Sequence, residues 1–263
     1  MATVATAGPR WPMWMTRTGS VAGLLGLVLL IVVGPGYRLG LLALAPALLG
    51  AALAFLLLII AFLIGGIGLL AGRGRSARTS RAAIAIVALG GLATISAGFW
   101  IVRLRSAPPI HDITTDFENP PEFHDVLPQR QAAGAANSTE YQRTQRANGR
   151  EIDVIDAQRR AYADVQPQLL PQAPVEALQL AEQAAKAMKW SIVAVDSGDG
   201  RIEATDTTWY FGFKDDVVIR VQPDPGGSRV DIRSTSRVGV GDVGANARRI
   251  REFTAQLRRL AGV

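Results

Sequence analysis

The chain has 263 residues, and its two halves carry opposite charge. Residues 1–105 contain nine arginines and no lysine or acidic residue, so they carry +9, whereas residues 106–263 carry −3. The basic excess lies beside apolar segments, where membrane topology explains it, so the high pI does not indicate a nucleic-acid partner. Cysteine is absent, which excludes disulfides, thiolate metal sites and a cysteine nucleophile.

Three long apolar segments predict a membrane bundle of about three transmembrane helices, at residues 14–33, 40–70 and 82–102. No cleavage pattern follows the first segment, so an uncleaved helix is favoured over a signal peptide. Gly34-Pro35-Gly36 predicts the end of this helix. The second segment exceeds one upright span, so we expect it to tilt, extend past the interface or bend near Pro46. No ionisable side chain lies within the uncharged runs Gly19–Val33, Leu39–Ala71 and Ala82–Val102, which argues against transport.

Arginines set the predicted orientation in a bacterial inner (plasma) membrane. Four of them lie between the second and third segments: Arg73, Arg75, Arg78 and Arg81. Such basic loops stay cytoplasmic, so we expect a cytoplasmic N-terminus and a periplasmic (extracytoplasmic) domain at residues 106–263. Arg103 and Arg105 argue mildly for the opposite orientation.

Glycines in the apolar segments predict close helix packing. They are Gly19, Gly23, Gly65, Gly66 and Gly68. Small residues let helix backbones approach, either within one chain or between copies in a homo-oligomer. Packing within one chain is favoured, and a homo-oligomer through these helices is the alternative; the expected partner of the helices is the lipid bilayer.

Residues 106–263 predict an α+β domain, an antiparallel four-stranded meander flanked by two helices. The expected strands are Trp190–Val195, Arg201–Thr208, Asp216–Gln222 and Arg229–Val238. One helix is expected from Pro174, and a closing helix is expected with Ile250 to Leu260 on its apolar face. Residues 107–127 predict extended chain, and residues 129–150 predict a polar loop with one short helix.

Four motifs resemble the bacterial domain-of-unknown-function 1499 family over about residues 108–260. They are Pro109-Ile-His-Asp-Ile-Thr-Thr-Asp116 with Asn119-Pro-Pro121, Arg201-Ile-Glu-Ala-Thr-Asp-Thr-Thr208, Phe213-Lys-Asp-Asp-Val217, and Arg233-Ser-Thr-Ser-Arg-Val-Gly-Val-Gly-Asp-Val-Gly-Ala-Asn246. Some members are similar throughout, with membrane helices ahead of the domain. The resemblance implies a cell-envelope protein with no assigned activity, and it supplies no catalytic residues to carry over.

The last motif contains the candidate binding site. Its residues, with one from the preceding strand, are Arg233, Ser234, Ser236, Arg237, Asp242, Asn246 and Asp216. One interpretation is structural: strand alternation puts Arg233, Arg237 and Asp216 on one sheet face, where they form ion pairs. The other is an anion site, in which the arginines converge with backbone amides before the last helix.

Other polar residues give weaker hypotheses. His111 and His124 lie among aspartates, but their spacing matches no metal signature, so we expect no metal and no cofactor. Asp215 and Asp216 are neighbours on a strand and should face opposite ways, which argues against an acid–base pair. Ser234 and Ser236 have no histidine nearby in the sequence to activate them.

The sequence therefore predicts a membrane-anchored envelope protein whose outer domain binds a partner or an envelope component. The alternative is a hydrolase-like enzyme or an anion-binding module that uses the Arg233–Asn246 loop. Convergence of carboxylates and arginines in one deep pocket would favour the alternative, and a fully paired arginine face would favour the binding module.

Overall fold

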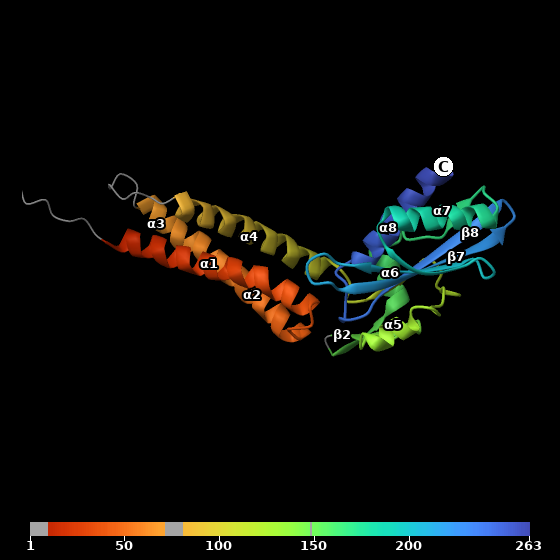
Figure 1. The fold of residues 1–263 in the computed structure, drawn as a ribbon, viewed down its shortest axis with the longest axis horizontal. Coiled ribbons are helices and arrows are strands. Elements are labelled where there is room, and N and C mark those ends of the chain that lie inside the picture. Colours follow the sequence, from red (N-terminus) through yellow and green to blue (C-terminus); the bar gives the residue numbers. More distant parts are fainter. Residues whose placement is uncertain (1–9, 72–80, 148) are drawn as a thin grey trace, which may run out of the picture. The chain divides into compact units, whose positions relative to one another are not determined.

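The computed structural model describes residues 10–71, 81–147 and 149–263. The chain forms two compact units (Figure 1). The helical unit extends to Arg103, and the α+β unit begins at Leu104.

The helical unit contains three helices that are long and apolar enough to cross a membrane. They are α1 (Trp11–Arg38), the continuous run of α2 (Leu44–Ile60), the π-helical turn η1 (Ala61–Gly65) and α3 (Gly66–Ala71), and α4 (Arg81–Ser106). Membrane helices satisfy their backbone hydrogen bonds internally, which explains why these apolar segments are helical throughout. The chain is thus a membrane protein with three predicted spans.

The first helix does not end at Gly34-Pro35-Gly36, so that prediction is wrong. Helix α1 continues through Pro35 to Arg38, and the Pro35 carbonyl still accepts a hydrogen bond from the Leu39 amide at 2.9 Å. Proline removes a donor but keeps a helical φ, and surrounding apolar residues favour an uninterrupted helix. The turn instead falls at residues 39–43, where Gly40 has φ +73°.

The second span is irregular at η1. Pro46 lies in the first turn of α2, where the missing amide costs no intrahelical bond. Beyond it, α2 continues to Ile60 before the π-helical turn. Pro46 therefore lies at the start of this helix, and the irregular part of the span is the π-helical segment η1.

Close helix packing within one chain is confirmed at Gly19. A Cβ atom there would lie 2.5 Å from the Cα atom of Gly65 on the neighbouring span. Gly68 likewise faces the backbone of Thr16. Packing between copies stays a prediction. Arg73, Arg75 and Arg78, on which the predicted orientation depends, lie outside the described residues.

The α+β unit is built on a six-stranded antiparallel sheet of order β1-β8-β7-β6-β5, with β4 also pairing with β8. The strands are β1 (Asp112–Thr114), β4 (Gln168–Leu170), β5 (Ser191–Asp196), β6 (Arg201–Thr207), β7 (Lys214–Asp224) and β8 (Gly227–Ser236). The predicted meander is β5 to β8. The sequence analysis missed β1 and β4, because three residues are too few to show alternation.

Helices α7 (Pro174–Ala187) and α8 (Ala245–Ala261) pack on one face of this sheet, as predicted (Figure 1). The buried core between them includes Ile219 and Ile232, and Trp190 stacks on Phe253 at 5.5 Å. Smaller elements complete the unit: α5 (Leu127–Ala132), α6 (Val154–Ala161), and a separate hairpin of β2 (Thr144–Ala147) and β3 (Arg150–Asp153).

The opposite face of the sheet is covered by the chain from Thr115 to Tyr141. A small apolar cluster there joins Phe123 and Val126 to Val218 of β7. Most other contacts beneath this covering segment are polar. The sheet is therefore buried on both sides, by helices on one and by largely irregular chain on the other.

Candidate functional site

Strand alternation divides the predicted site residues between the two faces of the sheet. Arg233, Arg237 and Asp216 lie under the covering segment, where they bond to its residues. Ser234, Ser236, Asn246 and Asp242 lie on the helix-covered face or at the start of α8. The structure therefore does not bring the set together in one site.

Arg237 and Asp216 form the centre of a buried charge cluster. The Arg237 guanidinium donates two hydrogen bonds to the Asp216 carboxylate, at 2.9 and 2.7 Å, and Arg130 of α5 adds a third at 2.5 Å. Thr205 donates to the same carboxylate at 2.7 Å. Asp216 is 0% exposed, so these neighbours supply its hydrogen bonds in place of water.

The guanidinium of Arg233 is also buried and hydrogen-bonded to protein groups. It forms a bidentate pair with Asp112 of β1 at 2.9 and 2.6 Å, and it donates to the carbonyls of Pro121 and Thr139. Its guanidinium also lies 5.1 Å from the ring centre of Phe123 and 5.3 Å from that of Tyr141. The arginine thus fastens the covering segment to the sheet.

Buried carboxylates on this face of the sheet also bond to the covering segment. Glu203 accepts the backbone amides of His124, Asp125 and Val126, which precede α5. Arg201 pairs with Glu203 and with Asp125. A carboxylate in contact with several amides at the start of a helix is favoured by the helix dipole.

Asp231 completes this charged layer. It accepts hydrogen bonds from Arg220 and Arg229, and both arginines also bond to Asp116 of the covering segment. Thr115 donates to Asp231 as well. Ion pairing across this face is confirmed, and the pairs extend from the strands to the covering segment.

The second group of predicted residues forms a hydrogen-bonded cluster beneath α8. Ser234 donates to Asn246, and the Asn246 amide donates to Ser236 and to the His111 carbonyl. Arg249 of α8 donates to Ser234 and pairs with Asp215 at 2.5 Å. Within the described part of the chain, neither serine is bonded to an imidazole or a carboxylate that could remove its proton, so the structure shows no activation of the kind that a nucleophile needs.

Asp242 caps the start of α8. Its carboxylate accepts the amides of Gly244 at 2.8 Å and Asn246 at 2.6 Å. Burial raises the pKa of Asp242, and this effect outweighs that of the two hydrogen bonds, which lower it. Gly244 precedes the helix with φ +78°, which explains a glycine there.

The structure also bears on the weaker hypotheses, an acid–base pair at Asp215 and Asp216 and a metal site at the histidines. Asp215 and Asp216 bond to groups on opposite faces of the sheet, to Arg249 and Arg237 respectively. His124 lies 3.8 Å from Glu122 at the surface. Within the described residues, no group of three or more His, Cys, Asp or Glu side chains is arranged to hold a metal ion.

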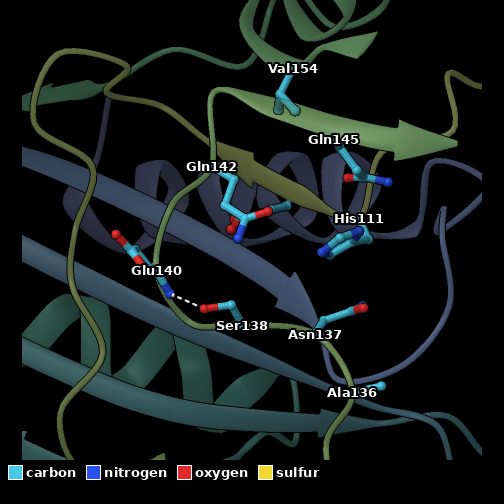
Figure 2. A pocket seen from close by; sticks show the side chains of 9 residues that line it. His111, Ala136, Asn137, Ser138, Glu140, Gln142, Gln145 and Val154 are labelled. Atoms are coloured by element: carbon cyan, nitrogen blue, oxygen red, sulfur yellow. Dashed lines mark hydrogen bonds between the residues drawn. The ribbon is translucent and has the colours of Figure 1, made fainter. Parts of the chain in front are cut away.

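A polar hollow of about 220 Å³ lies beside His111 and adjoins both clusters, since Asp112 pairs with Arg233 and the His111 carbonyl accepts a hydrogen bond from Asn246 (Figure 2). It is lined by His111, Asp112, Ala136, Asn137, Ser138, Glu140, Gln142, Gln145 and Val154. Figure 2 shows His111 and Gln145 on one side of this space and Glu140 on the other. We call this space the His111 pocket.

His111 has an unused hydrogen-bonding atom here. Its Nδ1 is buried and has no partner among the described residues. Burial lowers the pKa of His111, while the Asp112 carboxylate and a hydrogen bond to the Val240 backbone raise it. The ring is therefore neutral at neutral pH, with its donor used by Val240 and one nitrogen left to accept.

The sequence analysis missed the pocket, although it had singled out His111. Asn137, Glu140 and Gln145 lie in a polar stretch that shows no periodicity. They meet His111 because Asn137 bonds to the carbonyls of Ser236 and Gly239, and Gln145 bonds to those of Pro109 and Val240. Those contacts join segments far apart in the sequence, and no local signal predicts them.

The fold defines a class: a membrane protein with three apolar helices followed by a sheet-rich α+β unit. A family model described as "Protein of unknown function (DUF1499)" matches residues 112–257, and the chain belongs to this family. The match begins at β1 and ends within α8, so it spans the whole sheet. No curated protein matches the chain.

Proposed function

We propose that this chain is a multi-pass protein of the bacterial plasma membrane whose extracytoplasmic domain binds a partner or an envelope component and catalyses no reaction. The observation that carries the proposal is that the charged residues of the Arg233–Asn246 segment are bonded to one another and to the backbone. Catalytic acids, bases and nucleophiles need to face a substrate, and these groups are buried and occupied. The His111 pocket, by contrast, is an open space lined by polar side chains.

The hydrolase alternative would need an activated serine or a facing pair of carboxylates. Ser234 and Ser236 bond to Asn246, an amide that cannot serve as a base. Both oxygens of Asp216 accept hydrogen bonds from Arg130 and Arg237, so this carboxylate is not available to a substrate. The geometry therefore supports binding over hydrolysis.

Two experiments test the proposal. A reporter that is active only outside the cytoplasm, fused after Val263, should be active, because the arginine distribution favours an outside domain. Activity from a cytoplasm-only reporter at the same point would overturn the orientation and the localisation.

The second experiment compares the full chain with its Ser234→Ala and Ser236→Ala variants on a panel of ester and phosphate-ester substrates. We expect no turnover above background from any of them. Turnover by the parent chain that disappears in one serine variant would establish the hydrolase instead.

A further inference from the structure

The loop between β6 and β7 has an aromatic tip, Trp209-Tyr-Phe-Gly212. The Thr208 amide donates to the Phe213 carbonyl at 2.8 Å, and the Phe213 amide donates to the Thr208 hydroxyl at 2.8 Å. These two bonds close the loop and leave the four tip residues between them. Trp209 is 85% exposed, more than any other large apolar side chain in the described residues.

Part of this loop belongs to the helical unit, which includes Tyr210–Gly212. The Tyr210 hydroxyl donates a hydrogen bond to the Leu30 carbonyl of α1. The Tyr210 ring lies against Gly34 of the same helix, where a Cβ atom would come within 2.5 Å of the ring. A glycine at this position therefore lets the ring reach the helix backbone, and the loop is fixed to the C-terminal part of α1.

The contact lies at the depth of a membrane–water interface. Trp11 and Trp14 lie at the start of α1, and tryptophans are enriched where a membrane helix meets the headgroups. Gly34 follows Trp14 by 20 residues, and a helix of this length spans about 30 Å, the thickness of the hydrocarbon core. Tyr210 therefore meets α1 at the level of the second interface.

Other aromatic residues lie at the same level. Tyr37 of α1 packs edge-on against Phe211, with 6.3 Å between the ring centres. Three consecutive spans alternate in direction, so α4 ends on the same side of the membrane as α1. Its last turns contain Phe99 and Trp100, which are both exposed. Trp209 adds an exposed indole ring to this aromatic belt.

We propose that the β6–β7 loop is a membrane contact in addition to the three spans, in which Tyr210 fixes the loop to α1 and Trp209 lies among the lipid headgroups. An indole ring has an apolar body and one N–H donor, which suits the boundary between acyl chains and headgroups. The occupant of this surface is thus the bilayer that contains α1. This contact goes beyond the proposed function and needs neither a partner nor a particular orientation, because α1 reaches both interfaces either way.

Spin labelling tests the surroundings of position 209, and the chain has no native cysteine to interfere. Trp209→Cys and Leu169→Cys are labelled with a nitroxide in the full chain, in phosphatidylcholine nanodiscs. Leu169 is the matched control, because it is 66% exposed and pairs with Arg229 at the β7–β8 end of the sheet, away from the loop. We expect the ratio of collisions with oxygen to collisions with a polar nickel chelate to be at least about threefold higher at position 209, because the chelate stays in water.

A glycine variant tests the attachment to α1. Adding Gly34→Ala to the labelled Trp209→Cys chain places a Cβ atom against the Tyr210 ring, so the ratio should fall toward the Leu169 value. Gly98→Ala is its control on α4, where a Cβ atom would meet nothing within 4 Å, and it should leave the ratio unchanged.

Equal ratios at positions 209 and 169 would overturn the membrane contact. A label at position 209 that is shielded from both reagents would overturn it too, and would indicate a protein neighbour instead. An unchanged ratio in Gly34→Ala would overturn the attachment through Tyr210.

Fluorescence of the native tryptophan provides an independent measurement. Lipids brominated near the headgroup should quench less intensity in Trp209→Phe than in the parent chain, and equal quenching would contradict the proposal. Failure of the proposed function would appear separately, as hydrolytic turnover or a cytoplasmic C-terminus.

Discussion

Both faces of the sheet are buried at the central strands β7 and β8, but they are stabilised by different interactions. On the helix-covered face, Ile219 is 0% exposed among aliphatic and aromatic neighbours. On the face under the covering segment, Asp216 is also 0% exposed, but its neighbours are Arg130 and Arg237. An alternating strand with charged residues on one side therefore need not have a solvent-exposed side.

The difference has an energetic consequence. Apolar burial stabilises roughly in proportion to area and tolerates small changes of shape. Buried ion pairs contribute little net stability, yet removing one partner leaves an uncompensated charge. The charged face should therefore be the more sensitive to single substitutions, and it should specify where the covering segment docks.

The largest effect is expected for Asp216→Ala. The change leaves Arg130 and Arg237 buried without their shared carboxylate, so the free energy of unfolding should fall by about 3–5 kcal/mol. Chemical denaturation of the detergent-solubilised full chain measures this. Glu118→Ala, at an exposed position, should change it by less than about 0.5 kcal/mol. A loss below about 1 kcal/mol in Asp216→Ala would contradict the structural assignment of this cluster.

A double-mutant cycle at Arg233 and Asp112 tests whether the buried pair acts as a unit on the charged face. Arg233→Met leaves Asp112 buried and unpaired, so we expect a loss of about 3–5 kcal/mol. Adding Asp112→Leu should recover at least half of that loss, because two apolar side chains can replace a buried pair. Additive losses from the two substitutions would show that they do not act as a pair.

Asp242→Ala tests the cap of α8 and should cost about 0.5–2 kcal/mol. Asp242→Asn should cost less, since its single amide oxygen can still accept one of the two backbone amides, of Gly244 or of Asn246. Burial raises the folded pKa of Asp242, so its ionisation opposes folding, and the free energy of unfolding should fall as pH rises through this titration. Asp242→Asn should remove that pH dependence, and an unchanged pH profile would argue against a buried ionising group.

The smallest effect is expected on the apolar face. Ile219→Val deletes one buried methylene and should cost about 0.5–1.5 kcal/mol by the same denaturation measurement. The loss should not depend on salt, because no charge is involved. A cost as large as that of Asp216→Ala would remove the proposed difference between the faces.

Much of the sheet could be predicted from the sequence, because its strands alternate and its helices have apolar faces. Val217, Ile219 and Val221 indicated the core side of β7, and Asp216 and Arg220 indicated the other side correctly. The covering segment could not be predicted. Its backbone is held by Glu203 and Arg233, whose partners lie 77 residues or more away in sequence.

The candidate site was less predictable than the fold. Charged residues at Arg233 and Arg237 indicated a chemically rich segment, but sequence alone does not show whether a buried arginine faces a ligand or a carboxylate. The His111 pocket depends on loop residues with no periodicity and on side-chain bonds to distant carbonyls. Only the three-dimensional arrangement brings these groups together.

Arg237→Ala is the most direct test of whether this charged face is structural. The substitution removes two of the hydrogen bonds to Asp216, so the melting temperature of the full chain should fall by at least about 5 °C, and added phosphate should stabilise neither form. A variant that melts like the parent, while a phosphate-induced stabilisation of the parent disappears, would contradict the account and identify the arginine face as an anion site.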